Sequence, residues 1–142
     1  MFESGYACCQ SVFAAYADLF GIDRETALRL SGPLSAGVGR MREVCGAVSA
    51  MAMISGLNEG FTDPDDSEAK AASSALVREM AAEFKKEHDT IICRELLGLP
   101  EGMEYEKSSA AEARTPEYYA SRPCSGVVRT AASIVEKMIF KI

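Results

Sequence analysis

The sequence of 142 residues contains a single histidine, His88. Ser-His-Asp chemistry therefore has little support, and a Cys-His pair would require Cys93 to approach His88. Lys and Arg form no basic stripe, and the net charge of −6 argues against a surface that neutralises nucleic-acid phosphates. We expect no nucleic-acid partner.

Long apolar runs are also missing. The longest uncharged stretches, 4–17 and 44–58, fall short of the roughly 18–20 apolar residues that a membrane helix needs. The first residues lack the basic start and the cleavage setting of an export signal. We expect a cytoplasmic protein without a membrane span, where a reducing environment keeps most of the five cysteines out of static disulfides.

Three familiar ligand-binding patterns are absent as well. Gly32 and Gly37 have the spacing of a phosphate loop, but Lys and Ser/Thr do not follow Gly37. The acidic residues at 63–66 do not begin an EF-hand loop, because Glu68 stands where that loop needs glycine. The cysteines form no CxxC, zinc-finger or ferredoxin spacing. Any site that they share must be assembled by the fold.

Most of the chain has helical periodicity, and no run of β-branched and aromatic residues alternates with a period of two. The pattern predicts an all-α fold, a single compact bundle of about five to six helices in one domain, 1–142, with a long loop before the last helix. The expected helices are approximately 4–20, 24–30, 40–55, 64–87, 91–97 and 125–140. The loop at 99–123 is expected to contain one helical turn near 117–120.

Glycines and short polar residues mark the ends of these helices. Gly21 is expected to end the first helix, and Asp23 to cap the second. Asp63 can cap the long fourth helix with Pro64 at its first position, and Thr90 can cap the fifth.

The stretch 37–50 has an unusual composition. It begins as a glycine-rich turn, continues through charged residues and becomes small and apolar around Cys45. The backbone amides of Gly37 and Gly39, with Arg40 beside them at an expected helix start, could hold an anion. The alternative is a tight turn that needs glycine for positive φ. Gly46 leaves little side chain, which allows close approach of another helix.

The cysteines are the main chemical signal. Cys8, Cys93 and Cys124 each fall within about the first turn of an expected helix, where the dipole and the free amides stabilise a thiolate and lower the thiol pKa. A thiolate is the form that attacks disulfides and binds metals. Because free cysteine is among the most buried residue types, inert core thiols are the alternative.

Four ordered blocks together resemble the C_GCAxxG_C_C family of small redox-active proteins of bacteria and archaea. The blocks are 5–12, 37–49, 93–98 and Cys124 ahead of an Ala/Val-rich helix, and the resemblance runs from about 5 to 138. Matched to the family's pattern, its four cysteines fall on Cys8, Cys45, Cys93 and Cys124, with Cys9 as an extra one. The last glycine of the family's central motif is Ala50 here. The resemblance implies a redox or metal role for the four cysteines.

Three functions are compatible with these observations. The first is thiol/disulfide exchange or electron transfer with an unidentified redox partner, by a thiol-dependent oxidoreductase in which Cys8 and Cys45 are the preferred pair. The second is a module in which the thiolates of Cys8, Cys45, Cys93 and Cys124 hold zinc or an iron–sulfur cluster. The third is a helical interaction protein with structural thiols, for example a homodimer through its small-residue central helix.

Overall fold

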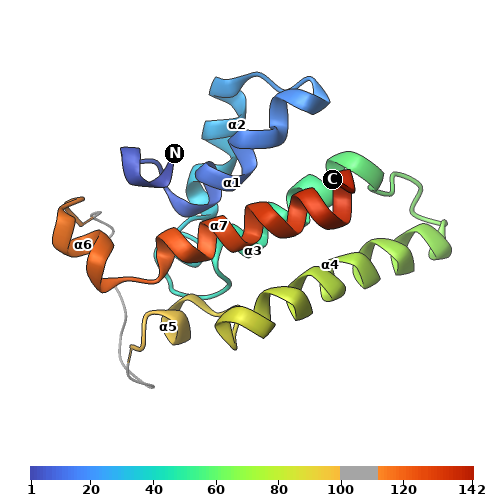
Figure 1. The fold of residues 1–142 in the computed structure, drawn as a ribbon. Helices are drawn as coiled ribbons and strands as arrows, with labels where there is room; N and C mark the ends of the chain where they lie inside the picture. The colour runs from blue at the N-terminus through green and yellow to red at the C-terminus, as the bar shows by residue number, and fades with distance from the viewer. Residues whose placement is uncertain (100–111) are drawn as a thin grey trace.

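The structure is a computed structural model that describes residues 1–99 and 112–142. Within these two ranges the fold is all-α, with seven α-helices and no strand (Figure 1). An isolated antiparallel bridge between Val44 and Ile92 is the extended pairing found there. Among the described helices, none combines the length and the apolarity that crossing a membrane requires.

The α-helices are α1 (Cys8–Tyr16), α2 (Arg24–Ser31), α3 (Gly46–Glu59), α4 (Ser67–His88), α5 (Cys93–Leu96), α6 (Pro116–Ser121) and α7 (Cys124–Val135). Short 3₁₀ turns flank α1 and α2, namely η1 (Phe2–Ser4), η2 (Ala17–Phe20) and η3 (Gly32–Leu34), and a π-helical turn, η4 (Glu136–Phe140), continues α7. The expected second helix, the last helix and the turn near 117–120 are confirmed. Much of the expected loop at 99–123 falls on 100–111, outside the described residues.

Several helix ends follow the local signals in the sequence. The Asp23 carboxylate accepts a hydrogen bond from the Thr26 N–H at 3.0 Å and caps α2. Gly21 ends η2 in the left-handed conformation, with φ 79°. Asp66 caps α4 in place of Asp63, so that helix begins three residues later than expected.

Two further expected helix starts are wrong. The first helix does not begin at residue 4, because Gly5 with φ 100° separates η1 from α1. The central helix does not begin at Arg40, because Arg40 and Arg42 have φ 66° and 61°, and α3 starts only at Gly46. These left-handed residues cannot continue a right-handed helix.

The core lies where α1, α3, α4 and α7 meet. In Figure 1, α7 crosses α3, with α1 and α2 on one side and α4 on the other. α1 packs on α2, α3 and α7, while α3 packs also on α4 and α7. The largest fully buried side chains include Met51 of α3, Phe84 of α4 and Val135 of α7. This packing brings the beginnings of α1, α3 and α7 to one end of the fold.

Candidate functional site

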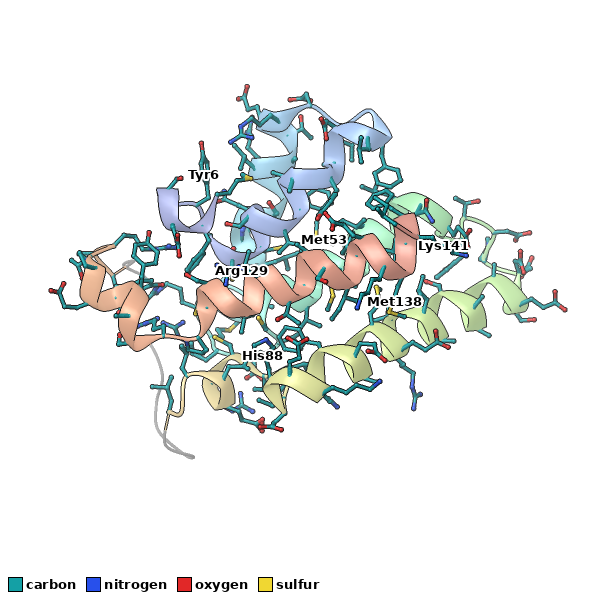
Figure 2. All side chains as sticks on the ribbon, viewed as in Figure 1. Tyr6, Met53, His88, Arg129, Met138 and Lys141 are labelled. Carbon is teal, nitrogen blue, oxygen red and sulfur yellow. The ribbon has the colours of Figure 1, made fainter. Side chains whose placement is uncertain are left out.

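Four of the five cysteines line one cavity of about 250 Å³. They are Cys8, Cys45, Cys93 and Cys124, which the sequence singled out and the fold brings together. All are free thiols. Cys9 is not among the lining residues: it is fully buried, and its Sγ lies 4.0 Å from the Sδ of Met53, labelled in Figure 2. The fold thus separates one core thiol from four that share a cavity.

Each cavity cysteine stands at the start of a helix. Cys8, Cys93 and Cys124 are the first residues of α1, α5 and α7, as expected from the sequence. Cys45 is the residue that precedes the first turn of α3, whereas the sequence suggested that it lies inside the helix. The cavity is therefore a meeting point of helix N-termini.

Gly46 allows the thiol of Cys8 to approach α3. A Cβ built on Gly46 would lie 2.5 Å from the Cys8 Sγ, and 3.1 Å from both the Cys9 N and the Ser35 Cα. Real Cβ atoms do not approach other heavy atoms as closely as 2.5 Å. The expected close approach at Gly46 is thus confirmed, and its partner is the thiol sulfur of Cys8.

A short backbone pairing holds the segment that contains Cys45 against the segment that contains Cys93. The Cys45 N–H donates to the Ile91 carbonyl at 2.8 Å, and the Cys93 N–H donates to the Glu43 carbonyl at 2.6 Å. These bonds flank the Val44–Ile92 bridge. The segment before α5 is therefore fixed against the start of α3, although the two are far apart in the sequence.

The loop at 36–42 is left-handed over most of its length. Five consecutive residues have φ between 55° and 73°, namely Ala36, Gly37, Val38, Gly39 and Arg40. Arg42 also has a positive φ, 61°. Each such residue other than glycine costs about 1–2 kcal/mol. A Cβ on Gly37 would overlap the backbone of Arg42 and Glu43. Strain of this kind is concentrated at functional sites, and here two of the strained residues, Arg40 and Arg42, line the cavity.

The anion site expected at Gly37, Gly39 and Arg40 stays a prediction, and the structure changes its surroundings in two respects. The Gly39 N–H donates to the Pro33 carbonyl at 2.8 Å, so this amide already has an acceptor. No helix begins at Arg40, so no helix dipole reinforces the loop there. Gly39 and Arg40 still line the cavity, where the charge comes from guanidinium groups.

Among the described residues that line the cavity there are four arginines and one carboxylate. The arginines are Arg40, Arg42, Arg114 and Arg122, and the carboxylate is Glu112. Glu112 binds Arg122, and its Oε1 lies 3.8 Å from Arg40 Nη2 and 3.9 Å from Arg42 Nη2. Glu112, Arg114 and Arg122 were not predicted from the sequence, because they belong to a stretch where no periodicity or motif stands out.

Aromatic side chains hold two of the arginines in place. The guanidinium of Arg114 lies 4.5 Å from the ring centre of Phe2 and 4.9 Å from that of Tyr118, and it donates to the carbonyls of Phe2 and Tyr6. The guanidinium of Arg122 lies 4.4 Å from the ring centre of Tyr118. Such contacts attract cations and restrict their movement.

Burial raises the pKa of Cys45, Cys93 and Cys124, contrary to the expectation from the helix-start positions of Cys93 and Cys124. Burial, and then the charge of Cys8, raises the pKa of Cys45, although the backbone N–H groups of Ala47 and Val48 lower it. Burial raises the pKa of Cys124 to about 11. The helix amides act as expected, but loss of water outweighs them.

Arg42 opposes this effect at Cys93. Burial raises the pKa of Cys93, while Arg42, whose Nη1 lies 3.7 Å from the Cys93 Sγ, lowers it. A charge on Cys8 raises the pKa of Cys45, Cys93 and Cys124. A charge on Cys93 likewise raises the pKa of Cys45 and Cys124, so neighbouring thiols in the cavity oppose one another's ionisation.

Cys9 allows a test of how strongly burial acts on these thiols. Burial raises its pKa from 9.0 to about 12. Between these values the unfolded chain releases the proton and the folded chain does not, so stability present below pH 9 is lost as the pH rises. We expect the free energy of unfolding to fall by about 1 kcal/mol per pH unit from this residue. Urea unfolding at pH 8 and pH 10 should show a smaller loss in Cys9→Ala; equal losses would contradict the assignment.

His88 has a structural position outside the cavity. Its Nε2 lies 2.9 Å from the Thr130 Oγ1, which in turn donates to Glu87, and its ring packs on Phe84. Figure 2 shows His88 where the end of α4 approaches α7. A Cys93–His88 pair is therefore not formed in this structure.

The donor groups that the structure describes are not arranged as a metal site. Across 1–99 and 112–142, no group of three or more Cys, His, Asp or Glu side chains is arranged to hold a metal ion. The zinc or iron–sulfur alternative requires the four thiolates as one ligand set, so it gains no support from their arrangement.

Comparison with known proteins identifies one family. The family described as "Putative redox-active protein (C_GCAxxG_C_C)" matches residues 6–138, a span that includes all four cavity cysteines. No curated protein and no solved structure matches the chain.

Proposed function

Because the chain belongs to the C_GCAxxG_C_C family of redox-active proteins, we propose that its cavity carries out thiol/disulfide exchange. The observation that carries this proposal is the gathering of Cys8, Cys45, Cys93 and Cys124 around one cavity. Free thiols beside one another and beside positive charge are the arrangement that exchange requires.

Cys8 is the residue that attacks in this proposal. It is partly exposed in the cavity, so a substrate can reach it. Its charge acts on each of the other three cavity thiols, which makes it central to the cluster. Cys45 is 6% exposed and lies next to Gly46, against which the Cys8 thiol packs. A resolving thiol needs to reach Cys8 and not the solvent, so Cys45 takes that role.

The exchange consists of two displacements. The Cys8 thiolate attacks one sulfur of a substrate disulfide; a mixed disulfide forms, and the first substrate thiolate leaves and takes up a proton. Cys45 then gives up its proton and attacks the Cys8 Sγ, and the second substrate thiol leaves. In sum, one substrate disulfide and two cysteine thiols yield two substrate thiols and a Cys8–Cys45 disulfide. Two electrons and two protons pass to the substrate, and a dithiol reverses the sequence.

Disulfide mapping tests the proposal directly. Reduced protein is exposed to one equivalent of hydroxyethyl disulfide under anaerobic conditions, its free thiols are then alkylated in denaturant, and its peptides are analysed by mass spectrometry. We expect a Cys8–Cys45 linkage and an alkylated Cys9, because Cys9 is fully buried. A bridge from Cys8 to Cys93 or Cys124 would replace Cys45 as the resolving residue. Uniformly free thiols would contradict the proposal and favour structural thiols.

A further inference from the structure

The described lining residues carry more positive charge than a single reactive thiolate needs. The whole chain has a net charge of −6, yet the part of the lining that the structure describes includes four arginines and one carboxylate. Three of these arginines, Arg40, Arg42 and Arg122, face the carboxylate of Glu112. A carboxylate is therefore the group around which this part of the cavity is built.

We infer that the substrate is a small carboxylate-bearing thiol or disulfide, and that its carboxylate binds where the Glu112 carboxylate now lies. This inference rests on the proposed function and names its substrate class. The substrate sulfur would then face Cys8, since Cys8 and the three arginines line the same cavity.

Glu112 is more exposed than the three arginines that it faces, which favours its replacement by the carboxylate of a substrate. The side chain of Arg42 is 4% exposed, and those of Arg40 and Arg122 are each 18% exposed, whereas that of Glu112 is 47% exposed. A buried guanidinium must keep an anionic partner, because an uncompensated buried charge is costly. Glu112 can turn into water, and a substrate carboxylate can take its place.

The ligand chemistry follows from the type of cation. Arginine offers a planar fork of donors that matches a carboxylate in a bidentate manner. Phe2, Leu96 and Val127 also line the cavity and reduce the water around the charges. A poorly solvated ion pair is stronger than an exposed one. The cavity volume of about 250 Å³ suits a small molecule and not a folded protein.

Three symmetrical disulfides of similar length test the inference on the wild-type chain. They are dithiodipropionate, a dianion; hydroxyethyl disulfide, which is neutral; and cystamine, a dication. The oxidation rate of reduced protein is measured with each by stopped flow or timed alkylation, and divided by the rate of the same disulfide with mercaptoethanol. We expect the normalised rate of the dianion to exceed that of the neutral compound by at least about tenfold at low ionic strength. Cystamine should be slowest, and added salt should reduce the differences.

The outcomes separate the two proposals. Equal normalised rates for the three disulfides, or a preference for cystamine, would overturn the carboxylate site and leave thiol exchange intact. No reaction with any of the three would overturn the exchange itself. The comparison of the three disulfides, with and without added salt, uses the wild-type chain, so it does not depend on whether a variant folds.

Substitutions locate the preference in the cavity. Glu112→Gln removes the internal carboxylate and should increase the preference for the dianion, whereas Arg122→Gln should reduce the ratio of dianion to neutral rates severalfold. Arg29→Gln is the matched control, because the Arg29 side chain is 81% exposed on α2 and does not line the cavity. An unchanged ratio in Arg122→Gln, with circular dichroism like that of the wild type, would contradict this placement.

Discussion

Replacing Cys8 by alanine should abolish the reaction of the cavity with small disulfides. In the proposed sequence Cys8 makes the first attack, and burial raises the pKa of Cys45, Cys93 and Cys124, so none of the three supplies a ready thiolate near neutral pH. We expect the oxidation rate by hydroxyethyl disulfide to fall at least about 100-fold. The measurement is the timed loss of free thiols at pH 7.5.

The neighbouring residue offers a matched control. Cys9→Ala removes a thiol one position along the same helix, but Cys9 is fully buried and does not line the cavity. Its oxidation rate should stay within about twofold of the wild type, since no reacting atom is lost. If Cys9→Ala lost activity and Cys8→Ala kept it, the assignment of the nucleophile would be wrong.

The same assay separates attack from resolution. In Cys45→Ala the first displacement proceeds and the second does not, so the protein should accumulate as a mixed disulfide with the mass of one added substrate thiol. Intact-protein mass spectrometry detects this adduct. A rapid loss of the adduct would indicate that Cys93 or Cys124 takes over as the resolving residue.

Replacing Gly46 by alanine should destabilise the fold at the cysteine cluster. The added Cβ would lie 2.5 Å from the Cys8 Sγ and 3.1 Å from the backbone N of Cys9, so α1 and α3 would have to separate. Overpacking of this kind costs about 1–3 kcal/mol. We expect a loss of free energy of unfolding in this range by urea denaturation, together with slower oxidation by disulfides.

Another glycine of α3 is the control. A Cβ on Gly56 would meet no heavy atom within 4 Å, so Gly56→Ala should be neutral or should stabilise the helix by about 0.5–1 kcal/mol. A double-mutant cycle with Cys8→Ala isolates the contact: removing the Sγ should restore part of the stability lost in Gly46→Ala. Equal losses at Gly46 and Gly56 would show that the close approach to Cys8 is not the cause.

The helical fold and several of its details follow from local signals. Periodicity predicts the all-α class, and Asp23 caps α2 because its carboxylate reaches an amide three residues further on. The same kind of signal predicts that Cys8, Cys93 and Cys124 stand at helix starts. The order of the four cysteines and of the motif around Gly46 also points to the family, whose match covers 6–138.

The start of α3 could not be predicted in this way. Arginine is a good helix former, so Arg40 and Arg42 favour a helix by propensity. Both residues instead have positive φ. They belong to a loop in which Gly37 packs directly against the backbone of Arg42 and Glu43. Contacts with α5 also act on this loop, because Arg94 donates to the Arg42 carbonyl and pairs with Glu43 at 3.0 Å. Tertiary contacts override a local preference of a few tenths of a kcal/mol.

The sequence by itself determined the class of fold, the identity of the four cysteines and the small residue that lets α1 approach α3. Only the tertiary structure decided that the four thiols share one cavity with Arg122 and Glu112, and that burial raises the pKa of Cys124 above its ordinary value. The physical reason is the separation along the chain of the residues that interact. Helix periods and caps depend on residues three or four positions apart, whereas desolvation and the meeting of distant charges depend on which helices pack together.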